Sequence, residues 1–300
     1  MKPQAANIMN GLLVIDKPAG MTSRDALNRV QKWFPRKTKI GHTGTLDPLA
    51  TGVLVVCIGV ATRLADFVQA MGKSYTSRFR LGATSTTDDA DGAIVEIPKA
   101  LPPTRERLDA ALAGFVGTID QLPPAYSALM VGGHRAHDLA RQGKDVPLAA
   151  RDVRIEAIRV LAYEWPFLDV EIDCGKGTYI RSIARELGEK LGIGGLVQTL
   201  RRTRVGPFTA EQGVGVDTAP SDLRAALLPV STPLVGMPTV QIDAESERRM
   251  RCGQTIPMPP ANADDPPAEG IDVAILDVRG ELIGIAAVHR GLAPRIVLKR

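Results

Sequence analysis

Apolar residues recur along this chain with two different periods. Residues 11–15 and 53–58 are short, continuous apolar runs, typical of strands covered on both faces. Residues 75–81 and 168–174 instead alternate apolar with polar side chains, which predicts strands with one face in water. Apolar residues at helical spacing predict helices beginning near Thr22 or Ser23 and over 180–191. The pattern therefore predicts an α/β fold with a mixed sheet.

The end of the chain has a different pattern. Few periodic residues occur over 228–238, so we expect a first domain over 1–236 and a second over 237–300. The second domain should be small and rich in β-structure, with a helix over 244–252 and strands over 271–278, 282–288 and 295–298. Residues 257–269 are rich in proline and acids and should form a mobile loop.

Composition limits the class of protein. Hydrophobic residues make up 44% of the 300, which excludes a wholly disordered chain. The longest apolar run, 53–60, is far shorter than the roughly 20 residues that span a bilayer. The first ten residues lack the apolar block of a signal peptide. The three cysteines lie far apart and predict neither a disulfide framework nor a zinc site. We therefore expect a cytoplasmic protein without membrane association.

Basic residues gather in two places although the net charge is only +4. Six lie between residues 24 and 39, and a second cluster occupies 201–204. Such clusters attract polyanions, but taken alone they are more often ordinary solvated faces.

Residues 41–52, GHTGTLDPLATG, are the densest candidate for chemistry. Glycines let the backbone approach a ligand closely, and Pro48 holds Asp47 outside the helical region. The segment could thus present one carboxylate rigidly in front of the buried strand 53–58. A tight turn, in which Asp47 only accepts hydrogen bonds from nearby backbone, fits the spacing as well.

The same motif closely resembles the catalytic motif of the TruB family of tRNA pseudouridine synthases. Further segments are similar to that family in the same order, over about the first 230 residues: 13–20, 73–82, 87–92, 119–143, 175–181 and 200–202. The resemblance implies the pseudouridine synthase fold with an RNA-binding insertion, about 119–150. It also implies that residues 237–300 form a PUA-like RNA-binding module.

The resemblance implies isomerisation of uridine at position 55, in the T-loop of tRNA, on a flipped-out base and without a cofactor or metal. Asp47 is then the catalytic carboxylate, which attacks the base, attacks the sugar or removes a sugar proton. Arg181 is its partner, because a guanidinium lowers the pKa of a neighbouring carboxyl group. Tyr75 contacts the uracil and helps to remove the C5 proton.

The remaining site residues follow from the same resemblance. His42, Tyr179 and Leu200 are expected to contact the substrate, His42 by filling the gap that a flipped base leaves. The residues expected to contact RNA phosphates are Lys17, Arg135, Arg141, Arg201 and Arg202. The partner is the T-arm of tRNA, and we expect a monomer that requires no protein partner.

Two other classes of function remain open from the sequence. An RNA chaperone or assembly factor on the same scaffold would bind tRNA but would not need Asp47. A small-molecule hydrolase using Asp47 would act without RNA, and its binding would not weaken with salt. The basic clusters count against the hydrolase.

Overall fold

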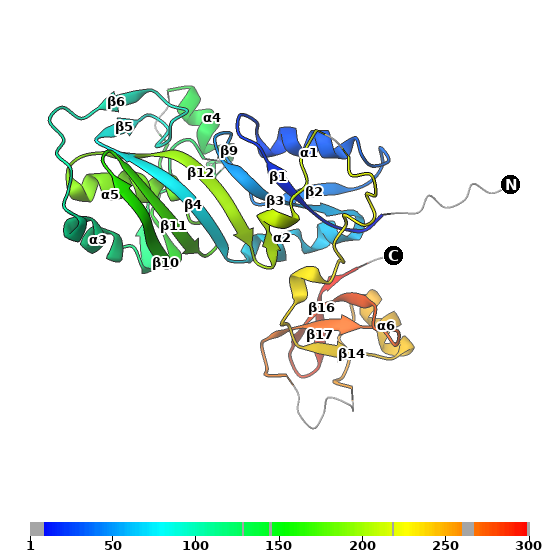
Figure 1. Cartoon of the computed structure of the whole chain (residues 1–300). Coiled ribbons are helices and arrows are strands. Elements are labelled where there is room, and N and C mark those ends of the chain that lie inside the picture. The colour runs from blue at the N-terminus through cyan, green and yellow to red at the C-terminus, as the bar shows by residue number, and fades with distance from the viewer. Residues whose placement is uncertain (1–8, 128, 144–145, 218, 260–266, 299–300) are drawn as a thin grey trace.

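The computed structural model describes residues 9–127, 129–143, 146–217, 219–259 and 267–298. The chain before residue 210 contributes nine strands to one curved, mixed sheet, and a smaller sheet follows it (Figure 1). The strands of the large sheet are β1 (Gly11–Lys17), β2 (Ile40–Thr43), β3 (Thr51–Ile58), β4 (Lys73–Leu81), β7 (Gly117–Gln121), β10 (Arg151–Glu164), β11 (Phe167–Cys174), β12 (Gly195–Val205) and β13 (Phe208–Thr209). The α/β fold and the mixed sheet predicted from the sequence are confirmed.

The order of strands in the large sheet is β1-β3-β12-β4-β11-β10-β7, with β2 beside β3 and β13 beside β12. Every pair is antiparallel except β3 with β12, which meet in parallel over only two residue pairs, Thr51 with Arg201 and Gly52 with Arg202. This short parallel seam joins two halves of the sheet. The loop that carries Asp47 enters β3 at the seam.

The first helix shows why its sequence begins a helix where it does. In α1 (Ser23–Gln31), Thr22 accepts a hydrogen bond from the backbone N–H of Asp25, whose carboxylate accepts one from that of Thr22. This capping box satisfies two backbone donors that a helix start leaves free. Ala26, Leu27 and Val30 pack into the core and leave the other face of α1 in water.

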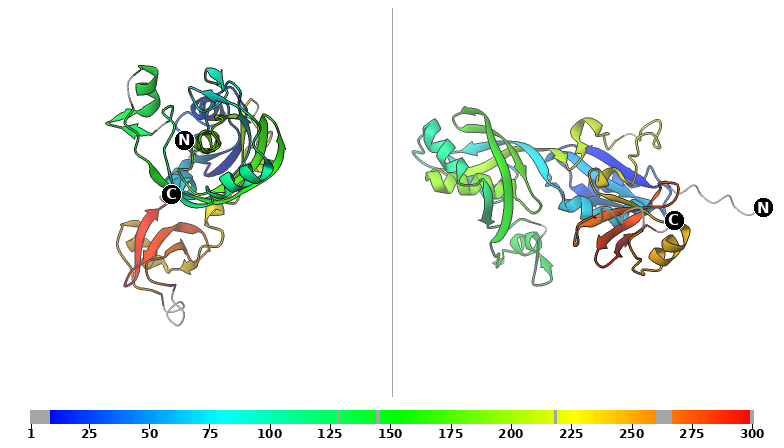
Figure 2. Two further views of the ribbon diagram at one scale, coloured as in Figure 1. Left: turned by 90° about the vertical axis from the view of Figure 1, so that its left-hand side faces the viewer. Right: turned by 90° about the horizontal axis from the view of Figure 1, so that it is seen from below.

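The other helices and short strands before residue 236 complete the part of the chain built on the large sheet. They are 3-10 helix η1 (Gly59–Leu64), α2 (Ala65–Ala70), β5 (Ala83–Ser85), β6 (Ile94–Glu96), α3 (Arg105–Ala113), β8 (Met130–Val131), β9 (His134–Arg135), α4 (Ala136–Arg141), α5 (Ile180–Leu191), η2 (Ala210–Gln212) and η3 (Thr232–Leu234). Figure 2 shows β8, β9 and α4 projecting from the edge of the sheet. Helix α5 packs along β12 and against α3, and Arg181 in its first turn reaches the loop that carries Asp47.

Strand β3 is the central buried strand that the apolar run predicted. Leu54, Val56 and Ile58 face one hydrophobic cluster, and Val53 and Val55 face another on the opposite side. Because both faces of β3 are buried, neither face has a position at which a polar side chain would contact water. This explains the continuous apolar sequence of the strand.

Gly52 allows β3 and β12 to meet at the seam. Its φ is +97°, and a Cβ built there would lie 2.1 Å from the carbonyl oxygen of Arg202. We expect Gly52→Ala to lower the free energy of unfolding by at least about 2 kcal/mol, because both the backbone conformation and the contact exclude a methyl group. Urea denaturation measures this. Gly41→Ala, with nothing within 4 Å of its added Cβ, is the matched control and should stay within about 1 kcal/mol of wild type.

The smaller sheet has the strand order β14 (Thr239–Gln241), β15 (Asp272–Leu276), β16 (Leu282–Val288) and β17 (Leu292–Val297), with α6 (Ala244–Arg251) beside it. It has its own cluster of buried apolar residues. A further cluster joins Leu64 of η1 to Ile285 and Leu298, so the smaller sheet packs against the part of the chain that carries the large sheet. The expected loop over 257–269 falls largely on 260–266, outside the described residues.

No helix among the described residues is both long enough and apolar enough to cross a membrane.

Candidate active site

Asp47 lies in the loop between β2 and β3, and neighbouring segments hold this loop by its backbone. The Ser23 hydroxyl, at the start of α1, donates to the carbonyl oxygen of Leu46 (3.0 Å) and accepts from its N–H (2.7 Å). The N–H of Gly20 donates to the carbonyl oxygen of Pro48 (2.9 Å). The backbone is thus fixed on both sides of Asp47.

Lys17 also holds this loop, which corrects the expectation that it contacts RNA. Its side chain is 0% exposed. Its ammonium donates to the carbonyl oxygens of Pro18 (2.8 Å), Met21 (2.8 Å) and Pro48 (3.4 Å). Burial lowers the pKa of Lys17 to about 8, an effect that the nearby Asp47 carboxylate opposes. An enclosed ammonium that bonds three carbonyls cannot reach a phosphate on the surface.

Arg202 also holds this loop, and it borders the cavity next to Asp47. It is 1% exposed, and its guanidinium donates to the carbonyl oxygens of Val53 (2.8 Å) and Gly44 (3.0 Å). Gly44 and Val53 lie on either side of Asp47 in sequence, so Arg202 ties together the two ends of the loop.

Arg201 points to the opposite face of β12, because neighbouring side chains of a strand alternate. Its guanidinium forms a two-pronged ion pair with Asp16, with both N–O distances 2.9 Å. The carboxylate neutralises the charge that we expected to meet RNA.

Arg181, in the first turn of α5, is brought to Asp47 as the sequence predicted. Its Nε lies 3.0 Å from Oδ2 of Asp47, and the side chain is 4% exposed. The remaining nitrogens donate to the carbonyl oxygens of Thr87 (2.9 Å) and Tyr126 (2.8 Å). Arg181 therefore joins the Asp47 loop, the turn after β5 and the segment after β7.

Asp89 is a site residue that the sequence reasoning did not single out. Its carboxylate is almost fully buried, and Oδ2 lies 3.6 Å from Nη1 of Arg181. Arg181 thus lies between two carboxylates, Asp47 and Asp89. Nothing in the sequence distinguishes Asp89 from its neighbours Asp88 and Asp91, because the distinction is a contact with a helix 92 residues further along the chain.

Burial raises the pKa of Asp47, and the Arg181 guanidinium opposes this rise. A third of the side-chain surface (34%) still faces the cavity, but protein atoms withdraw the carboxyl group from bulk water. The lowering that we expected from Arg181 is therefore present, but desolvation outweighs it. The positive charge of Arg181 limits the cost of keeping Asp47 ionised at neutral pH.

Asp89 adds a second effect of opposite sign, because its negative charge raises the pKa of Asp47. Asp89→Asn should therefore lower the pKa of Asp47 and move the acid limb of the kcat/KM profile to lower pH. At neutral pH, we expect turnover to fall by one to two orders of magnitude, roughly, because Arg181 loses a partner that fixes its position. Single-turnover rates measured across pH test both expectations.

Asp88→Asn is the matched control, since the Asp88 carboxylate pairs with Arg185 at 2.6 Å and not with Arg181. Its acid limb should coincide with that of wild type. An Asp89→Asn profile that moved to higher pH would contradict this description of the site.

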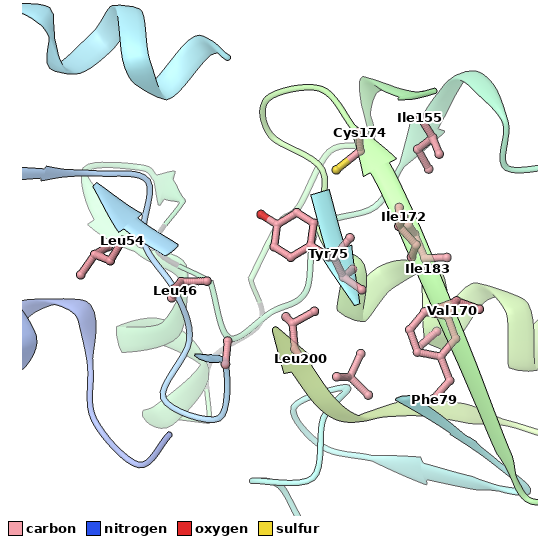
Figure 3. Packing of buried hydrophobic residues seen from close by; sticks show 14 of the residues in the cluster. Leu46, Leu54, Tyr75, Phe79, Ile155, Val170, Ile172, Cys174, Ile183 and Leu200 are labelled. Carbon is pink, nitrogen blue, oxygen red and sulfur yellow. The ribbon is translucent and has the colours of Figure 1, made fainter. Parts of the chain in front are cut away.

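Asp47 and Arg181 border a cavity of about 640 Å³, which Tyr75, Tyr179 and Leu200 also line. Figure 3 shows the ring of Tyr75 between Leu46 and Leu54 on one side and Ile172 on the other, with Leu200 close by. Burial raises the pKa of Tyr75, so its hydroxyl is protonated at neutral pH. The cavity therefore offers a planar ring, an apolar wall and the carboxylate of Asp47; Asp66 and Asp152 also border it.

Tyr179 is the residue before the first turn of α5, and its backbone is fixed by Gln121 of β7. The N–H of Tyr179 donates to the side-chain oxygen of Gln121 (2.7 Å), and the Gln121 amide donates back to the carbonyl oxygen of Tyr179 (3.0 Å). The Arg151 guanidinium lies 4.9 Å from the centre of the Tyr179 ring. These contacts fix one wall of the cavity.

Three expected contacts lie outside this constellation. His42, on β2, is half-buried and does not line the cavity; its Nδ1 is enclosed without a hydrogen-bond partner among the described residues. Arg141 is exposed at the end of α4. Arg135 belongs to β9, but its side chain lies outside what the structure describes. Within the described part of the chain, no cluster of three or more His, Cys, Asp or Glu side chains could hold a metal ion.

Two family models match consecutive parts of the chain. Residues 32–180 match the N-terminal domain of the TruB family pseudouridylate synthases. Residues 181–235 match the tRNA pseudouridylate synthase B C-terminal domain. Asp47, Tyr75 and Tyr179 fall in the first match, and Arg181 begins the second.

Bacterial relatives named tRNA pseudouridine synthase B match most of the chain. The protein of Ralstonia pickettii (strain 12J) is 42% identical over 303 residues, which cover 97% of this chain and 94% of the relative. That of Mycobacterium sp. (strain KMS) is 48% identical over 73% of this chain and 75% of its own. That of Cereibacter sphaeroides (strain ATCC 17023) is 44% identical over 82% and 83%.

Solved structures share the fold. The chain superposes on an H/ACA RNP bound to a substrate RNA containing 2'-deoxyuridine, with a TM-score of 0.71 and 22% identity over 97% of this chain and 85% of the other. A Cbf5-Nop10-Gar1 complex gives a TM-score of 0.70 and 25% identity over 96% and 85%. From the family models and the coverage of its relatives, this chain belongs to the TruB family of pseudouridylate synthases, enzymes that isomerise uridine to pseudouridine.

Proposed function

We propose that this enzyme converts the uridine at position 55, in the T-loop of tRNA, into pseudouridine without a cofactor. The observation that carries the proposal is the ion pair of Asp47 with Arg181, 3.0 Å long, at the wall of a cavity lined by Tyr75 and Leu200. The curated relatives supply the substrate class, since their names specify tRNA.

The isomerisation requires few chemical groups besides the Asp47 carboxylate, its Arg181 partner and the cavity. The bond from N1 of uracil to C1' breaks, the ring turns, and a bond from C5 to C1' forms. C5 loses its hydrogen as a proton and N1 gains one, so no electron or group enters or leaves. Asp47 supplies the carboxylate, by attack on the base, attack on the sugar or removal of a sugar proton. Tyr75, which also lines the cavity, stacks on the ring and assists the loss of the C5 proton.

A uridine that stays stacked within the tRNA cannot reach Asp47 in its protein loop. The target base must therefore flip out of the RNA stack to enter the cavity. The cavity has the volume of an ordinary small-ligand pocket. We expect His42, on β2 just before the Asp47 loop, to contact the RNA by filling the gap that the flipped base leaves. The 119–150 insertion, with Arg135 and Arg141, embraces the T-arm.

The domain division follows the same proposal. We infer a catalytic domain over 1–236 and a PUA-like RNA-binding domain over 237–300, whose four-stranded sheet has its own core. The enzyme acts as a monomer on the T-arm, and its widely spaced cysteines, free in the structure, suit the cytoplasm.

Release of tritium from C5 of uridine tests the reaction and its position together. Unmodified tRNA transcript labelled at C5 of uridine should release one equivalent of tritium per molecule, in EDTA and without added cofactor. A matched transcript with cytidine at position 55 should release none. Release from the second transcript would refute the position, and release from neither would refute the reaction.

A further inference from the structure

We propose that the exposed face of α1 and the segment that follows it bind the phosphate backbone of the RNA next to the target uridine. This α1 surface consists of Arg24, Arg29, Lys32, Arg36, Lys37 and Lys39, all of which are exposed. The inference rests on the proposed function, and it assigns a path for the RNA that the cavity alone does not define.

Charge pairing separates the α1 surface from the other arginine-rich surface. On the outer face of the large sheet, arginines are neutralised by acids: Arg78 pairs with Asp169 at 2.8 Å, and Arg159 pairs with Glu171 at 2.7 Å. Arg201 is neutralised by Asp16 in the same way. That face therefore has little free positive charge for a polyanion.

The α1 surface is not neutralised in this way. Among the ion pairs of the described residues, only the pair of Arg29 with Asp217 involves it. The one acid within the helix, Asp25, has its carboxylate engaged by Thr22 in the capping box. Unpaired cations on one face attract phosphates and release their counterions on binding.

The α1 surface begins at the catalytic loop. Ser23, the first residue of α1, holds Leu46 through two hydrogen bonds, and Leu46 precedes Asp47. Arg24 is close enough to His42 for its charge to add to burial in lowering the pKa of that histidine. If one nucleotide lies at Asp47, the nucleotides next to it contact His42 and Arg24. Nucleotides more distant from Asp47 contact the remaining cations of the α1 surface.

The size of the surface and its lack of exposed apolar groups favour RNA. The nine residues of α1 rise by roughly 13 Å, the length of about four stacked nucleotides. Its apolar side chains, Ala26, Leu27 and Val30, are buried, so the exposed face has no group to insert into a lipid layer. Figure 1 places α1 on the same upper side of the molecule as α4 of the insertion, so both are available to one RNA.

The test compares two double variants that remove the same charge. Lys32→Ala with Arg36→Ala changes the part of the α1 surface that is distant from Ser23. Arg105→Ala with Arg107→Ala changes exposed residues of α3, at the other end of the sheet (Figure 1). Affinity for full-length tRNA transcript is measured by filter binding at several salt concentrations, and single-turnover tritium release is measured at saturating RNA.

We expect the α1 variant to bind tRNA about tenfold more weakly at 0.15 M salt, with a log–log salt slope smaller by about one to two. Its rate at saturation should stay within about twofold of wild type, since neither side chain approaches the cavity. The α3 variant should match wild type in both measurements. Equal affinity and slope for both variants would overturn the proposal while leaving the proposed function intact. Absence of tritium release from wild type, with salt-dependent binding retained, would refute the function instead.

Discussion

Asp47→Asn is expected to lower the rate of pseudouridine formation by at least about 10⁴-fold and to leave the affinity for tRNA nearly unchanged. The amide has the same shape as the carboxyl group but can neither attack carbon nor accept a proton at neutral pH. The backbone hydrogen bonds that hold the loop, such as those from Ser23 to Leu46, do not involve the Asp47 side chain, so the loop should keep its conformation.

Single-turnover tritium release and filter binding, measured on the same preparation, check this prediction. Asp109→Asn is the matched control, because Asp109 is an exposed acid on α3 that pairs only with Arg105. Asp47→Asn that retained more than about a tenth of the rate would remove Asp47 from the chemistry. Loss of tRNA affinity equal to the loss of rate would instead assign Asp47 to binding.

Arg181→Met should reduce turnover by roughly 10³-fold and move the acid limb of the rate profile to higher pH. The guanidinium lowers the pKa of Asp47, so its removal raises that pKa and leaves less of the ionised form at any pH near it. The variant also loses the links to Thr87 and Tyr126 that hold the walls of the cavity. Raising the pH should therefore recover part of the rate but not all of it.

The control for Arg181→Met is Arg185→Met, one turn further along α5, where the guanidinium pairs with Asp88. That variant should keep the acid limb of wild type. Circular dichroism and thermal unfolding establish that Arg181→Met is folded, and Arg181→Lys, which restores a charge but not the fork of donors, should have an intermediate rate. An acid limb at the wild-type position in Arg181→Met would contradict the electrostatic role.

Periodicity allowed much of the fold to be predicted. The continuous apolar run of β3 and the alternation in β4 and β11 each mark how a strand is covered, and these strands are present. The order of the strands could not be predicted in this way. The parallel seam of β3 with β12 joins residues about 150 positions apart, and it depends on close approach at Gly52 that no local pattern reveals.

The candidate site, like the fold, could be predicted only in part from the sequence. Asp47 and Arg181 were paired by resemblance to a family, and the structure brings them into contact. Lys17 and Arg202 were expected at the RNA by the same resemblance, but the structure buries both side chains, which is rare for basic residues. The alternation of side chains along a strand could have indicated this burial. Lys17 lies on the same face of β1 as the buried Leu13 and Ile15, and Arg202 lies on the same face of β12 as Leu200.

Position-resolved mapping of pseudouridine tests the central claim most directly. Unmodified tRNA transcript is incubated with the purified enzyme or with Asp47→Asn, without added cofactor, and every uridine is examined. Conversion of the uridine at position 55 alone by wild type, and of none by Asp47→Asn, is the predicted result. Conversion at another position would contradict the substrate assignment, and conversion by Asp47→Asn would contradict the assignment of the chemistry to Asp47.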